Sequence, residues 1–166
     1  MKQTKRKPAA PSPLSPEMIV TAGLALAAER GWDALSLWDV AEKLGVGLVA
    51  VERLCPDKNA LLDLLGNLVD QTILADPVSP DQRVRDRLFD LTMRRFEALA
   101  RWKPGVVAVV ASWPAPDPFL PLTLMPALRR SLRRTLTAAG LTPTPLRVAG
   151  LGVVTVSLLR TWCADE

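Results

Sequence analysis

Histidine and tyrosine are absent from the 166-residue sequence, and only two cysteines, Cys55 and Cys163, are present. The cysteines stand far apart and form no C-x-x-C pattern. These absences exclude a Ser-His-Asp triad, a Cys-His dyad, a histidine-ligated metal site and a zinc ribbon. The acid pair Asp63 and Asp70 is interpreted as part of a solvated, charged helix stripe. We therefore expect a protein that is not an enzyme and has no metal and no cofactor.

Long hydrophobic runs are absent as well. The longest charge-free apolar stretches, 105–111 and 148–159, are shorter than the roughly 18 residues that a membrane-spanning helix needs. The first 16 residues carry basic side chains but lack the apolar segment of a secretory signal. Two cysteines are too few to cross-link a secreted fold, and free thiols fit a reducing compartment. We expect a cytoplasmic protein without a transmembrane segment.

Apolar residues are nevertheless plentiful and are spread along the chain. The sequence is 49% hydrophobic and 23% charged, which is typical of a globular protein with one ordinary core. No segment shows the strict alternation of a half-buried strand, whereas apolar residues recur at helical spacing throughout. The sequence predicts an all-α protein of about eight helices.

Three parts can be distinguished along the chain. Residues 1–14 combine prolines with basic residues and are predicted to be a disordered basic arm. We call residues 15–76 the head and residues 77–166 the body. Caps, glycines and prolines predict helices at about 16–31, 36–45, 47–54, 58–74, 79–102, 104–112, 120–139 and 145–162.

The head has the layout of a helix-turn-helix, with two short helices on either side of Gly45-Val46 after a longer helix. Its sequence from Ala28 to Leu37, from Asp39 to Val46 and from Pro56 to Leu62 resembles the N-terminal domain of the TetR family of transcriptional regulators. The resemblance covers about residues 15–70. It implies a three-helix DNA-binding head, a connecting fourth helix, and a helical body that binds a ligand and dimerises through its last two helices.

The recognition helix departs from that family. Where the family has a Ser or Thr, a Lys, a Tyr and a Phe, this sequence has Gly47, Leu48, Glu52 and Cys55, and Arg53 alone offers donors to a base or a phosphate. Ser36 and Lys58 occupy positions where the family makes phosphate contacts, although a helix cap and a helix surface also explain them. The candidate DNA-binding residues are Lys2, Lys5, Arg6 and Lys7 of the arm with Ser36, Gly47, Leu48, Arg53 and Lys58. The arm can equally be a solubilising tail.

Charge is distributed unevenly between the parts. Residues 15–76 hold four basic and ten acidic residues, a balance of −6, and residues 77–166 hold thirteen and seven, a balance of +6. A negative head argues against a phosphate-binding surface. Six arginines lie between Pro118 and Ala164, where no carboxylate is present. They are solvated, pair with acids of the head, or form an anion or lipid-headgroup site.

The candidate ligand-binding residues in the body are aromatic, sulfur-containing or cationic, because small-molecule sites are mostly apolar with few polar groups. They are Trp102, Trp113, Met125, Arg129 and Arg133. The large apolar side chains among them are also suited to the core or to a dimer interface.

We therefore expect a TetR-like regulator that binds double-stranded DNA, senses an apolar or anionic small molecule, and forms a homodimer through residues 120–162. The alternative is a protein with the same fold that has lost DNA binding. The segment Ser157–Trp162, followed by Ala164–Glu166, is similar to a tryptophan-centred segment of the lipid-binding accessory proteins of ubiquinone biosynthesis. That resemblance implies a bound lipid in place of DNA.

Overall fold

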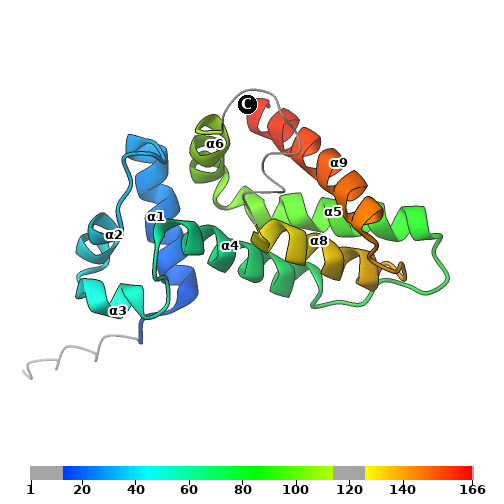
Figure 1. Cartoon of the computed structure of the whole chain (residues 1–166), viewed down its shortest axis with the longest axis horizontal. Helices are drawn as coiled ribbons and strands as arrows, with labels where there is room; N and C mark the ends of the chain where they lie inside the picture. Colours follow the sequence, from blue (N-terminus) through cyan, green and yellow to red (C-terminus); the bar gives the residue numbers. More distant parts are fainter. Residues whose placement is uncertain (1–12, 114–125, 166) are drawn as a thin grey trace, which may run out of the picture.

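The computed structural model describes residues 13–113 and 126–165, and it contains eight α-helices and no strand in those ranges (Figure 1). The helices are α1 (Pro16–Arg30), α2 (Leu37–Leu44), α3 (Leu48–Glu52), α4 (Lys58–Ile73), α5 (Val84–Ala100), α6 (Lys103–Ala111), α8 (Pro126–Ala138) and α9 (Pro145–Ala164). The all-α prediction is confirmed. Helices α1 to α3 gather at one end of the molecule, and α4 leads from them to α5, α8 and α9 (Figure 1).

Local signals set the ends of the head helices. The Ser15 side chain accepts a hydrogen bond from the amide of Met18, and Pro16 occupies the first turn of α1. Ser36 and Asp39 form a capping box at the start of α2. Gly45 ends α2 in the left-handed conformation, with φ of 65°, which glycine adopts at little cost.

The start of α5 was predicted too early. Ser79, Pro80 and Asp81 precede the helix and form a turn in which the amide of Gln82 donates to the carbonyl of Ser79 over 3.3 Å. Arg83 is the N-cap, because its extended backbone, with ψ of 148°, interrupts helical geometry before Val84. The predicted helix over 120–139 is described from Pro126 onward, and residues 120–125 lie outside the described ranges.

Helix α6 joins the body to the main hydrophobic cluster of the head, while Leu132, Leu136 and Val148 of α8 and α9 form a second, smaller cluster. Gly105 lies so close to α1 that a Cβ atom built on it would be 2.4 Å from the carbonyl oxygen of Leu24. The indole Nε1 of Trp102 donates to Thr21 Oγ1 over 3.1 Å, and Arg101 pairs with Glu17 over 2.6 Å. Helix α6 and the residues just before it are therefore in direct contact with α1.

Helix α9 is long and apolar enough to cross a membrane by length and composition, a test that core helices of soluble proteins also meet. One side of α9 packs against the rest of the chain through Val148, Gly152, Thr155 and Val156. The ring of Trp162 lies 5.7 Å from that of Phe96 on α5, centroid to centroid. The helix is therefore part of the fold on that side.

Candidate functional site

The helix-turn-helix is held against α1 by its apolar side chains. Val40 and Ala41 on α2 and Val51 and Cys55 around α3 are buried in the head core. The amide of Val46 donates to the carbonyl of Ala41 over 3.0 Å across the turn. These contacts fix the direction in which α3 presents its outer face.

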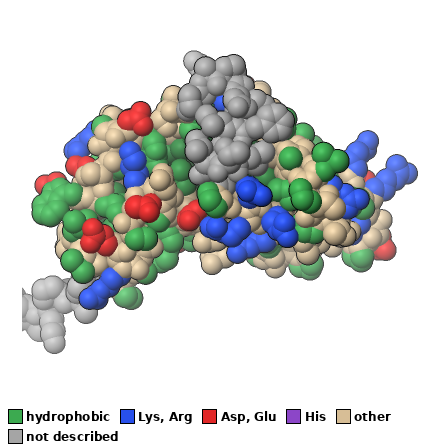
Figure 2. All heavy atoms as spheres, in the orientation of Figure 1, with side chains coloured by type: hydrophobic (Ala, Val, Ile, Leu, Met, Phe, Trp, Pro, Cys, Tyr) green, Lys and Arg blue, Asp and Glu red, His purple; other side chains and the backbone are tan. Residues whose placement is uncertain are grey.

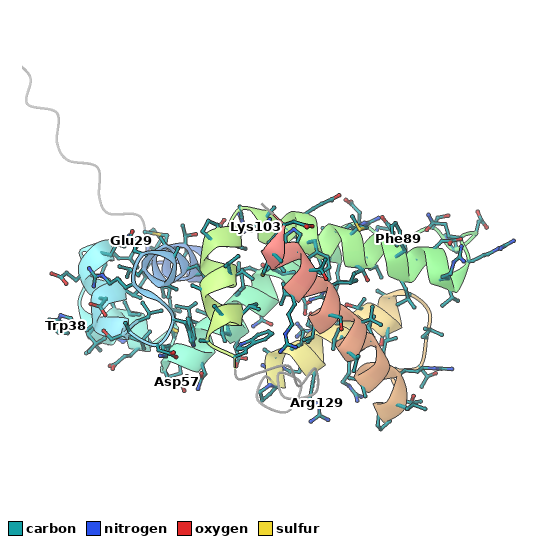
Figure 3. The ribbon with its side chains drawn as sticks, turned by 90° about the horizontal axis from the view of Figure 1, so that it is seen from above. Glu29, Trp38, Asp57, Phe89, Lys103 and Arg129 are labelled. Atoms are coloured by element: carbon teal, nitrogen blue, oxygen red, sulfur yellow. The ribbon has the colours of Figure 1, made fainter. Side chains whose placement is uncertain are left out.

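That outer face is mostly apolar. Trp38 on α2 is 64% exposed and Val49 on α3 is 63% exposed, and Figure 3 shows Trp38 at the end of the molecule that carries the head. Gly47, Glu52 and Arg53 are exposed, whereas Leu48 is half-buried. The surface that would face DNA thus offers one guanidinium, one carboxylate and large apolar side chains.

Sequence reasoning did not single out Trp38. The signal was its position off the predicted buried stripe of α2, which contains Leu37, Val40, Ala41 and Leu44. A tryptophan at such a position must be solvent-exposed or covered by a partner.

Most cations of the head are engaged by the protein itself. The contacts are Arg30 with Asp39 over 3.2 Å, Lys43 with Glu29 over 2.9 Å, and Lys58 Nζ with the carbonyls of Trp32 over 3.1 Å and Asp33 over 3.3 Å. Within the described residues Arg53 has neither an ion pair nor a hydrogen bond from its side chain. It is the head cation most available to a phosphate.

Hydrogen bonds lower the pKa of two carboxylates of the head. Hydrogen bonds from the side chain and backbone of Ser36 lower the pKa of Asp39, with Arg30 adding to the effect. A hydrogen bond from Lys43 lowers the pKa of Glu29. The Ser36 hydroxyl is therefore occupied by the capping box, in agreement with its predicted role as a helix cap.

A cavity of about 100 Å³, which we call the body cavity, lies between the body helices α5, α6, α8 and α9 and the connecting helix α4. Its walls are almost entirely apolar and include Leu62, Phe96, Val106, Trp113 and Leu159. The polar side chains among the lining residues are Arg95, Ser131 and Thr155. An apolar hollow with a few convergent polar groups is typical of a small-molecule site.

Arg95 is the charged residue of this cavity, and it is only 6% exposed. Its Nη1 donates to Ser131 Oγ over 2.7 Å and its Nη2 to Thr135 Oγ1 over 2.8 Å. Burial lowers the pKa of Arg95, and the charge of Asp70 acts in the opposite direction. The sequence carried a signal for this residue, because Arg95 stands between Leu91 and Leu99 in the buried register of α5.

Asp70 is buried, which corrects the prediction that it lies on a solvated stripe. It is 3% exposed and accepts hydrogen bonds from the hydroxyl of Ser131 and, over 2.8 Å, from Arg134 Nη1. The reason is that α8 crosses α4 at this point and covers the carboxylate. Asp63, two turns earlier on the same face of α4, stays partly exposed and pairs with Arg130 over 3.4 Å.

The arginines of α8 thus divide into two sets, and Figure 2 shows Lys and Arg side chains gathered over this helix. Arg130 and Arg134 pair with acids of α4, as one of the sequence alternatives expected. Arg129 and Arg133 are exposed and have no ion pair within the described residues. Figure 3 shows Arg129 at the outer edge of the body.

The other predicted site residues have different locations. Trp113 lines the cavity, whereas Trp102 lies in the contact between α6 and α1. Arg129 and Arg133 are not among the cavity-lining residues. The candidates Lys2, Lys5, Arg6, Lys7 and Met125 lie outside the described ranges.

The two cysteines are free thiols, and Cys55 is fully buried with its Sγ donating to the carbonyl of Asp57 over 3.2 Å. Burial raises the pKa of Cys55 to about 11, and the charges of Asp57 and Asp63 add to the shift. Burial also raises the pKa of Cys163. Among the described residues no cluster of His, Cys, Asp or Glu could hold a metal ion.

Comparison with models of protein families finds no match for the sequence, and comparison with curated protein sequences finds none either. Solved structures do match. A TetR transcriptional regulator from Nitrosomonas europaea is 22% identical, with a TM-score of 0.67, and the match covers 91% of this chain and 86% of that one. A TetR transcriptional regulator from Rhodococcus sp. RHA1 is 19% identical, with a TM-score of 0.56 and coverage of 89% and 81%.

A third match, TetR from Acinetobacter baumannii, is 21% identical, with a TM-score of 0.53 and coverage of 91% of this chain and 76% of that one. The agreement extends well beyond the helix-turn-helix into the body, where the sequence resemblance was weakest. The order of the helices, the turn at Gly45 and these matches along most of the chain establish that the protein has a TetR-like fold.

Proposed function

We propose that the protein is a transcription regulator, not an enzyme, in which a small molecule bound in the body cavity changes the affinity of the head for double-stranded DNA. The observation that carries the proposal is the position of α6. Its valines Val106 and Val109 line the cavity, while Gly105 packs against Leu24 of α1. One helix therefore contacts both the ligand space and the helix-turn-helix.

The mechanism follows from this shared wall. A ligand that fills the cavity favours one position of α6, and the close contact at Gly105 couples that position to the orientation of α1. The ligand binds one orientation of the head more tightly than the other. The difference between these two binding free energies limits how far the ligand can change the affinity for DNA. This coupling is reciprocal, so that DNA also changes the affinity for the ligand.

A homodimer through α8 and α9 is part of the proposal. The outer side of α9 presents Leu146, Gly150, Val154, Ser157 and Leu158. It carries no charged residue from Gly150 to Leu158, and the exposed Arg147 lies beside Leu146 at its start. Leu146 is 82% exposed. Apolar and small residues on one exposed helix face allow the close approach of a second copy, and two heads held in this way would read a palindromic site.

The test is enrichment of DNA from the source genome by the full-length protein at physiological salt, followed by sequencing. The matched variant lacks residues 2–12, so that Leu14, which packs on the head core, is kept. We expect enrichment of one palindromic site by both proteins. Absence of any selected site contradicts the regulator.

A second candidate function, a lipid-binding protein without DNA recognition, is favoured by the surface of the head. Three of its four cations are engaged internally, and Trp38 and Val49 are exposed where base contacts would be made. In that case no DNA is selected, and organic extraction of the purified protein yields a lipid. Replacing Arg129 and Arg133 together with alanine would then reduce lipid capture.

A further inference from the structure

The charge of Arg95 is only partly compensated within the fold. Its guanidinium has five N–H donors, and its hydrogen bonds go to two neutral hydroxyls, those of Ser131 and Thr135. The carboxylate oxygen Oδ1 of Asp70 lies 3.8 Å from Nη2, beyond hydrogen-bonding distance. Donors of a buried cation therefore remain free to bind a ligand in the cavity.

Arg95 shares its nearest carboxylate with a second arginine. Asp70 Oδ2 accepts a hydrogen bond from Arg134 over 2.8 Å, and the Arg134 side chain is about half exposed, so that water also solvates its charge. Asp70 therefore gives its hydrogen bond to Arg134 and stays 3.8 Å from Arg95. Because a buried charge is costly without hydrogen-bonded partners, a carboxylate that takes hydrogen bonds from Arg95 would stabilise it.

The cavity also limits the size and polarity of a ligand. A volume of about 100 Å³ corresponds to roughly seven to ten water-sized groups at about 10–15 Å³ each. Beyond Arg95, the walls near Phe96, Val106 and Leu159 are apolar. Such walls accept a hydrocarbon or aromatic tail but no second charge.

We propose that the cavity binds a small monocarboxylate with an apolar tail, whose carboxylate takes hydrogen bonds from Arg95 and whose tail lies against the walls formed by α4, α6 and α9. The inference rests on the proposed ligand-sensing function and names the class of ligand. Arg is suited to this role because its planar fork matches a carboxylate. Asp70 keeps Arg134 as its partner when the ligand is bound.

The first experiment measures ligand binding by the full-length protein without DNA. Octanoate, 1-octanol and octylamine share one tail and differ in charge, and the fluorescence of Trp113 in the cavity wall reports occupancy. A Trp113→Phe variant assigns the signal to that residue among the five tryptophans. We expect octanoate to bind at least tenfold more tightly than 1-octanol and octylamine to bind most weakly. Equal binding of octanoate and 1-octanol overturns the proposal.

The second experiment uses three variants. Arg95→Gln should bring octanoate down to the affinity of 1-octanol. Because Arg95 also supports the fold, Gly66→Leu provides an independent test that leaves Arg95 in place. A Cβ at Gly66 meets only Ala127 Cβ, at 3.8 Å, and Gly66 lines the cavity, so that a leucine there takes up ligand space. This variant should lose octanoate binding, and retention overturns the proposal. Arg85→Gln, an exposed control on α5 away from the cavity lining, should bind octanoate like the unmodified protein.

The two proposals fail separately. Octanoate binding that depends on Arg95, together with no selected DNA site, keeps the carboxylate site and removes the regulator. A selected DNA site together with no charge preference among the three probes keeps the regulator and removes the carboxylate site. The DNA enrichment and the binding assay are run on the same preparation for this reason.

Discussion

The three-helix unit of α1 to α3 and the contact between α4 and the body treat their charged side chains differently. Within α1 to α3 the ion pairs lie at the surface and join residues close in sequence: Arg30 and Asp39 are 9 residues apart, and Lys43 and Glu29 are 14 apart. Between α4 and the body the polar contacts of Asp70 are buried and distant in sequence: Ser131 and Asp70 are 61 residues apart, and Arg134 and Asp70 are 64 apart. The three-helix unit therefore depends little on any one charge, whereas the packing of α4 against the body depends strongly on one carboxylate.

The largest expected effect comes from breaking the buried cluster. We predict that Asp70→Asn lowers the free energy of unfolding by about 3 kcal/mol or more, since it leaves Arg95 buried without a counter-charge. Asp63→Asn is the matched control on the same helix, because Asp63 and Arg130 are both about half exposed, and it should cost less than about 1 kcal/mol. Urea unfolding of both variants measures the difference. If both variants lost the same unfolding free energy, burial would not make the contacts of Asp70 more important for stability than those of Asp63.

The second prediction concerns the contact that joins the two regions. Gly105→Ala should destabilise the protein by about 2 kcal/mol, because the new methyl group meets the backbone of Leu24, which has no flexible end to move. Gly66→Ala, also in a helix, has only an ordinary contact with Ala127 and should be neutral or stabilising. Thermal unfolding of the two variants gives the comparison. A stable Gly105→Ala protein would show that α1 and α6 can separate freely.

The third prediction tests the weak basic character of the head. Glu52→Lys reverses the charge on the exposed face of α3 and should strengthen DNA binding several-fold at low salt, with a salt dependence steeper by about 1 to 2 in logarithmic slope. Glu97→Lys makes the same change on an exposed position of α5 in the body. Fluorescence anisotropy across a salt series should show the effect for Glu52 alone. A similar gain in DNA affinity from Glu52→Lys and Glu97→Lys would show that the net charge of the protein, and not the face of α3, causes the effect.

The smallest expected effects are a difference in reactivity between the two thiols and a slight change in stability with pH. Cys163, which is half-buried, should react with a thiol reagent at pH 8 well before Cys55, whose raised pKa of about 11 leaves little thiolate. An ordinary cysteine has a pKa of 9.0, so the unfolded chain ionises first and stability should fall slightly between about pH 9 and pH 11. Cys55→Ala removes that slope. Rapid labelling of Cys55 in a Cys163→Ser protein would contradict its burial.

Particular residues show how far the sequence predicts this fold. Ser15, Ser36 and Gly45 act within one helical turn of their own positions, and the ends of α1 and α2 follow from them. The start of α5 was misplaced because Ser79-Pro80-Asp81 has the composition of a cap but forms a turn. Serine, proline and aspartate are common both in helix N-caps and in turns, so their presence does not distinguish the two. Here the extended backbone at Arg83 makes that residue the N-cap and leaves 79–82 as a turn.

The candidate site was predicted less well than the fold. Trp113, predicted as a ligand-binding residue from its type alone, lines the cavity, whereas Arg95 was assigned no role and Asp70 was assigned to solvent. The burial of Arg95 and Asp70 could not be predicted from neighbouring residues, because a charged residue is buried only when other helices bring partners to it. Those partners, Ser131 and Arg134, lie on α8.

The sequence by itself determined the helical class, the turn at Gly45, the absence of histidine and tyrosine from any site, and the poor inventory of base-reading groups on α3. The tertiary structure decided which charges are buried, where the cavity lies, and that α6 contacts both the cavity and α1. The physical reason is one of range. Caps, turns and helical periodicity arise from neighbouring residues, whereas the free energy of a charge depends on every group that replaces its water.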